Sequence, residues 1–251
     1  MSRLWLVGKT DRNAIFGVVI ALKQVSRWYS DEAFRAGKSS RVLDQLELDL
    51  KKGEFLYVIG GTGAGKSTLL RMLSTEESPS AGTISLFGYE LSSAAPGTLR
   101  SIRQAIAHIP QKTSLVGDLS VFENVSLAAR FAGARAGGQN LRARVVELLD
   151  RLGLGHKKDS RADCLSGGEA QRVSIAQALV RKPELILADE PTGAQDPDSA
   201  WGILDLLLKE NLGGSTVVVA THDRDMVRRV RKRTAVLKGG RIQMEDALCR
   251  S

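Results

Sequence analysis

The stretch that most restricts the fold of this chain is Gly60–Ser67, which reads G-G-T-G-A-G-K-S and fits the phosphate-loop pattern G-x-x-x-x-G-K-[ST]. An apolar run, Phe55–Ile59, precedes it and a helix-like run, Thr68–Leu73, follows it, which is the strand-loop-helix context that the motif requires. In such a loop the backbone N–H groups point inward at a phosphate, so a chance glycine-rich turn with a lysine is the weaker reading. We expect the Lys66 side chain to reach the β- and γ-phosphates and the Ser67 hydroxyl to bind Mg²⁺. The loop residues expected at the phosphates are Gly60, Gly61, Thr62, Gly63, Ala64, Gly65, Lys66, Ser67 and Thr68.

Composition places the chain among ordinary globular proteins, since 43% of its 251 residues are hydrophobic and 25% are charged. Its two cysteines, Cys164 and Cys249, cannot form a disulfide framework, which favours a reducing compartment. The longest apolar run, near Ala14–Leu22, is far shorter than the roughly 20 residues of a membrane-spanning helix. If the protein serves a membrane, we therefore expect another chain to supply the span.

Strand-like and helix-like segments alternate along most of the sequence. Alternating residues at Val42–Leu50 indicate a half-buried strand, and the apolar runs near residues 18–22, 185–188 and 216–220 indicate further strands. Residues 112–167 have helical periodicity instead and predict a helical subdomain. We expect a short N-terminal arm or extension over residues 1–17 and a single domain over 18–251, with a mostly parallel sheet.

A second motif ends the apolar run Leu185–Ala188 with two carboxylates, Asp189 and Glu190. Ligands of open α/β sheets bind at the carboxyl ends of the strands. Asp189 is therefore expected to hold Mg²⁺, and Glu190 to polarise an attacking water molecule as the catalytic base. An exposed acidic pair at a strand end is the alternative, which the phosphate loop upstream makes the poorer one.

A third motif, Leu165–Glu169, reads L-S-G-G-E and places Ser166, Gly167 and Gly168 at the start of a predicted helix. This arrangement offers a hydroxyl and backbone N–H groups to a second anion. A simple capping box, with Ser166 as the N-cap and Glu169 three residues later, is the competing interpretation.

These motifs occur in an order and spacing that resemble the ATP-binding subunits of the ABC family, over roughly residues 18–245. The resemblance implies an α/β P-loop NTPase fold with an antiparallel β subdomain, a RecA-like parallel-sheet core and an inserted helical subdomain. It also implies hydrolysis of ATP to ADP and phosphate, with Mg²⁺ as cofactor. By the same resemblance Gln111 contacts Mg²⁺ and signals to a membrane partner, Asp196 is the D-loop aspartate, and His222 contacts the γ-phosphate. Tyr29 looks like the aromatic that stacks on adenine, with Trp28 as the competitor.

The resemblance further implies a homodimer in the ATP-bound state, in which Lys66 of one copy and Ser166 of the other hold the same nucleotide. Within the family the motifs are most similar to the FtsE/LolD/MacB group, with the FtsE-type cell-division ATPases preferred over lipoprotein or small-molecule exporters. This implies an FtsX-like integral membrane partner and a cytoplasmic position on the inner face of the membrane. The chain departs from the group at Ala194–Gln195, where Asn-Leu usually precedes the aspartate, which puts that contact between subunits in doubt.

The net charge of +8 is concentrated in residues 224–241, which hold eight basic residues and one acid. A solvated helix face is one reading of this segment, and contact with an acidic partner or with anionic lipid headgroups is another. Nucleic-acid binding is disfavoured because no aromatic residues are interleaved with the charges. A soluble ABC ATPase that acts on nucleic acid and a regulatory module without turnover are the remaining alternatives.

Overall fold

The apolar run before the phosphate loop forms strand β3 (Phe55–Ile59) near the middle of a six-stranded sheet, in the order β10-β9-β3-β8-β7-β6. The computed structural model describes residues 17–29, 41–131, 139–193 and 196–245. All neighbouring strands of this sheet run parallel except β10, which pairs antiparallel with β9. The other strands are β6 (Ile106–Ile109), β7 (Leu185–Asp189), β8 (Thr216–Thr221), β9 (Arg233–Lys238) and β10 (Arg241–Glu245).

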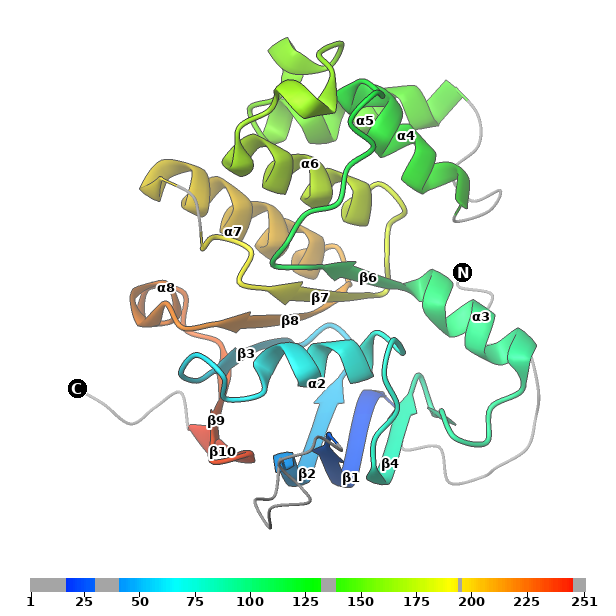
Figure 1. Cartoon of the computed structure of the whole chain (residues 1–251), viewed down its shortest axis with the longest axis vertical. Helices are drawn as coiled ribbons and strands as arrows, with labels where there is room; N and C mark the ends of the chain where they lie inside the picture. Colours follow the sequence, from blue (N-terminus) through cyan, green and yellow to red (C-terminus); the bar gives the residue numbers. More distant parts are fainter. Residues whose placement is uncertain (1–16, 30–40, 132–138, 194–195, 246–251) are drawn as a thin grey trace.

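Both faces of the central strands β3, β7 and β8 are buried, which explains their continuous apolar runs. Phe55, Tyr57 and Ile59 of β3 face one hydrophobic cluster, and the alternate residues Leu56 and Val58 face another. The first cluster lies under a helical layer and the second under an antiparallel sheet, so the parallel sheet is the middle layer of the molecule (Figure 1).

The antiparallel sheet has the order β2-β1-β4-β5, and it matches the expected antiparallel β subdomain. Its first strand is longer than the run at residues 18–22 indicated, because it continues through several register shifts to Trp28. Helix α2 (Lys66–Leu73) packs between this sheet and the parallel one. The strands are β1 (Val18–Trp28), β2 (Arg41–Lys51), β4 (Ala81–Leu86) and β5 (Tyr89–Glu90).

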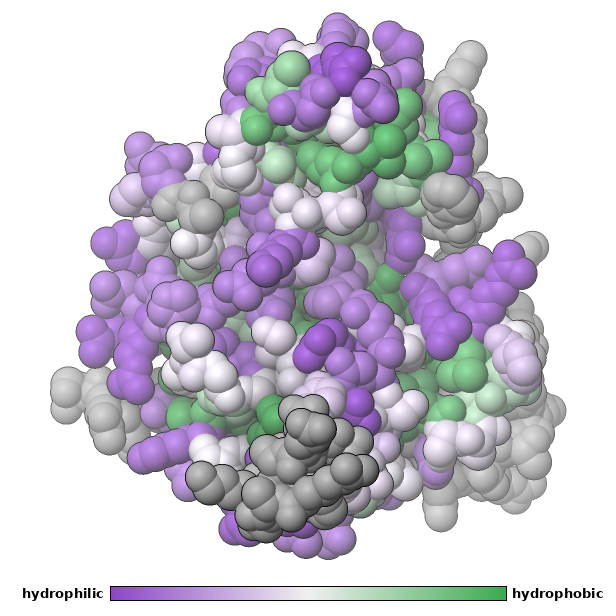
Figure 2. Space-filling view, viewed as in Figure 1, coloured by the Kyte–Doolittle hydropathy of each residue, from purple (hydrophilic) through white to green (hydrophobic). Residues whose placement is uncertain are grey.

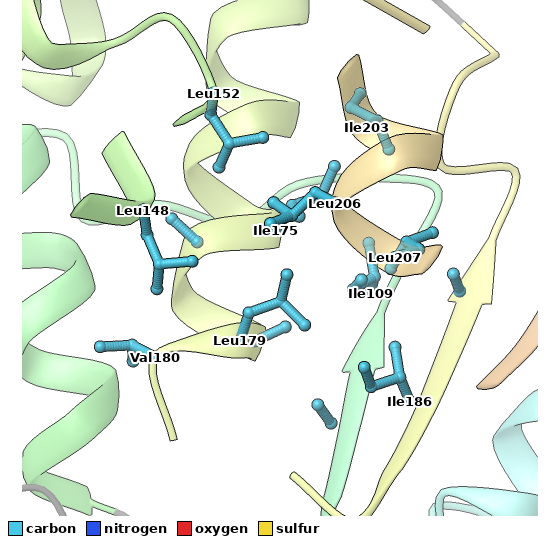
Figure 3. Packing of buried hydrophobic residues seen from close by; sticks show 14 of the residues in the cluster. Ile109, Leu148, Leu152, Ile175, Leu179, Val180, Ile186, Ile203, Leu206 and Leu207 are labelled. Atoms are coloured by element: carbon cyan, nitrogen blue, oxygen red, sulfur yellow. The ribbon is translucent and has the colours of Figure 1, made fainter. Parts of the chain in front are cut away.

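The helical layer covers the opposite face of the parallel sheet. Leu148 of α5 and Leu152, which directly follows that helix, pack against Ile175 and Leu179 of α6, which in turn lie beside α7 and the sheet (Figure 3). The helices of this layer are α4 (Val121–Phe131), α5 (Gln139–Arg151), α6 (Gly167–Leu179) and α7 (Pro197–Leu212), with short 3₁₀ turns η3 (Gly155–Lys157) and η4 (Ala162–Cys164) before α6.

The structure corrects the reading of the basic segment 224–241 as one helix face. Only α8 (Arg224–Arg229) is helical, and a short link over residues 230–232 leads from it into β9, the turn and the start of β10. The sequence analysis did not identify α3 (Pro96–Ala105) or β6, the edge strand of the parallel sheet, which directly follows α3. The expected N-terminal arm falls outside the described residues except for Gly17.

The surface seen in Figure 2 is mainly hydrophilic, with hydrophobic side chains gathered over the helical layer. None of the helices in the described parts of the chain combines the length and hydropathy that a bilayer crossing requires.

Candidate nucleotide site

The phosphate loop connects β3 to α2 and is held close to two other strands. Gly65, the N-cap of α2, has φ = +102°, and a Cβ there would lie 2.7 Å from Leu43 Cδ2. A Cβ on Gly60 would lie 2.6 Å from the carbonyl oxygen of Leu237 in β9. Because Gly65 has no side chain to accept the first N–H groups of α2, the helix start is open to an anion.

Lys66 is buried at this helix start, with 8% of its side chain exposed. Its ammonium group donates to the carbonyl oxygens of Gly60 (2.8 Å) and Gly61 (3.3 Å). The same group lies 3.3 Å from Oε1 of Glu190, so the structure brings the lysine and the proposed base together.

Glu190 follows β7 in a left-handed conformation with φ = +47°, which is uncommon for a residue with a side chain. Its backbone N–H donates to the carbonyl of Ala220 in β8 (2.8 Å), which fixes this conformation at the end of the sheet. The buried carboxylate contacts Nδ1 of His222 at 2.8 Å and accepts from the His222 backbone N–H at 3.3 Å. The His222 side chain is 66% exposed, on the wall of a cavity of about 380 Å³ that Glu190 and Thr192 also line.

Asp189 and Ser67 have the chemistry to hold Mg²⁺. Oδ1 of Asp189 is buried and has no hydrogen-bond donor among the described residues, although a buried carboxylate oxygen normally has one. A cation or its bound water would satisfy this oxygen. The described chain has no cluster of three or more His, Cys, Asp or Glu residues fit for a metal. Mg²⁺ is commonly bound through one or two carboxylates together with substrate phosphates, so a carboxylate such as that of Asp189 suits it.

Gln111 lies two residues beyond β6, at the same edge of the sheet as Asp189, because β6 and β7 are parallel with Ile109 opposite Ala188. Its side chain is exposed and makes no hydrogen bond with the described residues. The preceding carbonyl, that of Pro110, accepts from the buried Gln171 side chain of α6 at 3.3 Å.

The signature loop Leu165–Glu169 forms the capping box that was the competing interpretation. Ser166 Oγ accepts from the Glu169 N–H (3.3 Å), and the Glu169 carboxylate accepts from the Ser166 N–H (2.9 Å). Ser166 is nevertheless exposed, so capping does not close it to a ligand. Since α6 and α2 pack on opposite faces of the parallel sheet, the chain has two separate helix starts that suit anions (Figure 1).

Asp196 is the N-cap of α7, where its carboxylate accepts from the Ser199 N–H at 2.9 Å. Hydrogen bonds from Ser199 hold the pKa of Asp196 below its ordinary value. Arg172 of α6 donates to the Ser199 hydroxyl at 2.9 Å and so links the signature helix to this aspartate. The departure at 194–195 lies outside the described residues.

Tyr29 is held in a polar network that the sequence analysis missed. Its hydroxyl donates to Glu77 Oε2 (2.7 Å), and the Arg27 guanidinium lies 4.7 Å from the ring centroid. One ring face is thus covered, so stacking of adenine on Tyr29 would use the other face. The competitor Trp28 has the Arg41 guanidinium 5.8 Å from its ring. The adenine-stacking role stays a prediction.

Most cations of segment 224–241 have partners within the chain. Arg233 pairs with Glu54 at 3.1 Å and Arg241 with Asp44 at 2.9 Å. In addition, Arg228 lies 3.4 Å from Asp225, and Arg229 and Lys232 lie over the rings of Trp201 and Phe55. The carboxylates of Glu54 and Asp44 therefore offset part of the positive charge that the segment can offer to a polyanion.

The residues 43–193 match the model of the ABC transporter family. The chain is 36% identical to the cell division ATP-binding protein FtsE of Bacillus subtilis over 91% of this chain and 96% of that protein, and 37% identical to the FtsE of Mycobacterium tuberculosis over the same shares. It is 43% identical to the methionine import ATP-binding protein MetN of Nocardia farcinica over 84% of this chain and 63% of that protein. Among solved structures, it is similar to a dimeric post-hydrolysis state of an ATP-binding cassette bound to ADP and Pi, with a TM-score of 0.82, 33% identity and coverage of 91% of this chain and 98% of that one.

Proposed function

The chain belongs to the ABC transporter family as an ATP-hydrolysing subunit, and we propose that it is an FtsE-like ATPase that acts on an FtsX-like membrane protein in cell division. ATP and Mg²⁺ are its substrate and cofactor, and it works as a dimer with a membrane partner. The similarity to FtsE proteins along nearly their whole length supports the cell-division role. Its place is then the cytoplasmic face of the membrane.

One observation supports the reaction above all: the Glu190 carboxylate contacts both the Lys66 ammonium group and Nδ1 of His222. In the proposed reaction, the loop N–H groups and Lys66 hold the phosphates. Glu190 accepts the proton of the attacking water, and His222 donates to the γ-phosphate. Ser67, Asp189 and Gln111 are the proposed ligands of Mg²⁺, which supplies positive charge at the phosphates when bound.

The proposed dimer places Ser166, Gly167 and Gly168 of one copy against the nucleotide held by the phosphate loop of the other. The separation of the two helix starts within one chain supports this arrangement, because a single copy does not bring them to one ligand. Asp196 lies at the start of α7, where it would meet the partner copy.

A cleft of about 360 Å³ beside Pro110 is our candidate surface for the membrane partner. Arg181, just beyond α6, and Arg103 of α3 both line it. Burial lowers the pKa of Arg181, and no carboxylate of the described residues pairs with it. The glutamate of the cleft, Glu76, is already bound to His108 at 2.7 Å. A partner segment that carries an acidic side chain would neutralise Arg181.

Reconstitution tests this proposal. The chain is combined with the FtsX-like protein of the same genome, and Mg²⁺-dependent phosphate release and co-purification are measured. We expect hydrolysis and a stable complex, and Arg181→Gln should weaken the complex about tenfold while the exposed Arg100→Gln should not. Absence of hydrolysis with and without the partner would refute the ATPase role. Binding to a MetN-type permease in its place would favour the second candidate, import of a small molecule, and binding to an exporter would favour the LolD/MacB-like role.

Contact of residues 224–241 with anionic lipids is a further part of the proposal, supported by cations such as Arg224 and Arg231 that have no carboxylate partner among the described residues. Flotation with vesicles that contain anionic lipid tests it, and equal binding to neutral vesicles would contradict it.

A further inference from the structure

A carboxylate lies directly against the signature serine. Oε2 of Glu169 accepts from both the backbone N–H and the hydroxyl of Ser166, each at 2.9 Å. This bond stabilises the start of α6, because a carboxylate at this position caps the helix and interacts favourably with its dipole. It also places a negative charge beside a surface that must receive a triphosphate, and like charges oppose each other there.

Lys157, which belongs to none of the sequence motifs, compensates the negative charge of Glu169. Its ammonium group lies 2.7 Å from Oε1 of Glu169, the oxygen that does not bind Ser166. The contact lowers the pKa of Glu169 to about 2, with the lysine as the largest cause.

The lysine is held in place by its backbone. Lys157 ends the turn η3, where its N–H donates to the carbonyl of Leu154 (2.9 Å) and its carbonyl accepts from the Ser160 N–H (2.9 Å). Leu154 is fully buried in the cluster under the helical layer. This anchoring fixes the base of the Lys157 side chain beside Glu169, and the two side chains are only 32% and 15% exposed, so the pair is less mobile than the exposed surface ion pairs that contribute little.

We propose that Lys157 is a positioning residue of the signature half-site, which neutralises Glu169 and fixes its carboxylate so that Ser166 can receive the triphosphate held by a second copy of the chain. The inference rests on the proposed nucleotide-bridged dimer. Lys157 acts through Glu169 and not by direct attraction of the phosphate. Its effect should therefore vanish when Glu169 carries no charge.

A double-mutant cycle tests whether Lys157 acts through Glu169 or attracts the phosphate directly. ATP-driven dimerisation of the full chain is measured by light scattering in a Glu190→Gln background, and KM and kcat are measured with the native base. We expect Lys157→Met to raise the half-saturating ATP concentration about fivefold and Lys157→Arg to change it less than twofold. In the Glu169→Gln background, where the amide still caps α6, Lys157→Met should have no further effect.

The neighbouring Lys158→Met is the matched control, because no side-chain bond of Lys158 is found among the described residues and it should behave as the parent. An unchanged Lys157→Met variant, or an equal loss in the Glu169→Gln background, overturns the inference. An unchanged KM together with a large fall in the melting temperature of Lys157→Met also overturns it, because that result would assign Lys157 to stability alone. If the parent chain does not dimerise with ATP at all, the proposed function fails together with the inference, whereas normal dimerisation with an inert Lys157 removes the inference only.

Discussion

Replacement of Glu190 by glutamine keeps the shape of the side chain but removes its charge and its basicity. A positioned general base contributes about 10²–10⁴-fold in rate, which corresponds to about 2.7–5.5 kcal/mol of activation free energy. We therefore expect kcat to fall at least about 100-fold. The exposed Glu47→Gln in β2 is the matched control and should keep the parent rate.

The same substitution should leave ATP binding intact or tighten it. At 3.3 Å the attraction between Lys66 and Glu190 is about 5 kcal/mol for an effective dielectric constant near 20, before the cost of desolvation is subtracted. A bound triphosphate must compete with this carboxylate for the ammonium group, and in Glu190→Gln that competition is reduced.

The assays are phosphate release at saturating Mg²⁺-ATP and equilibrium binding of ATP, with melting curves to confirm folding. Turnover within about threefold of the parent in a folded Glu190→Gln protein would exclude Glu190 as the base, since a positioned general base typically contributes about 100-fold or more. Loss of ATP binding with unchanged turnover per bound nucleotide would instead show that the carboxylate positions Lys66.

Three further predictions concern stability. Gly60→Ala should lower the free energy of unfolding by about 1–3 kcal/mol in urea titrations, because its Cβ would meet the Leu237 carbonyl. Gly61→Ala is the control and should cost far less, because a Cβ there would have nothing within 4 Å. Equal costs of the two substitutions would contradict the close approach at Gly60. Asn124→Ala removes four hydrogen bonds between a fully buried amide and the backbone of residues 116–120, and should cost about 2–4 kcal/mol in the same titrations, while a loss below 1 kcal/mol would be unexpected. Because the pKa of Glu169 in the folded protein is lowered from 4.5 to about 2, the stability that its carboxylate contributes is complete above pH 4.5 and is lost as the pH falls toward 2. Glu169→Gln should therefore lose less stability than the parent over that range. Parallel acid-unfolding curves of the two proteins would refute this.

The sequence predicted the parts of the molecule that depend on local pattern. The glycines and flanks of the phosphate loop identified β3 and α2, and the apolar run before Asp189 identified β7. Because parallel strands end at one edge of the sheet, the sequence also indicated that Asp189 and Glu190 would face the loop. The contact of Glu190 with Lys66 follows from this shared edge.

The parts that sequence analysis missed depend on contacts between distant segments. Strand β9 lies inside a basic segment whose charges obscured its apolar residues, and only pairing with β3 shows it as a strand. Helix α3 did carry a local signal, Pro96 at its first turn, which was not used. The environment of Tyr29 and the contact of Lys157 with Glu169 join positions that no local pattern connects.

Helix α6 extends from the signature loop toward the cleft beside Pro110, a length of about 20 Å for its 13 residues. Its apolar side packs in the hydrophobic cluster, so we expect the whole helix to move as one rigid unit. If a membrane partner bound at Arg181 shifted this rigid helix, the signature loop at its other end would shift with it. The membrane partner and the nucleotide would then act on the two ends of the same helix, and no signal would have to cross the sheet.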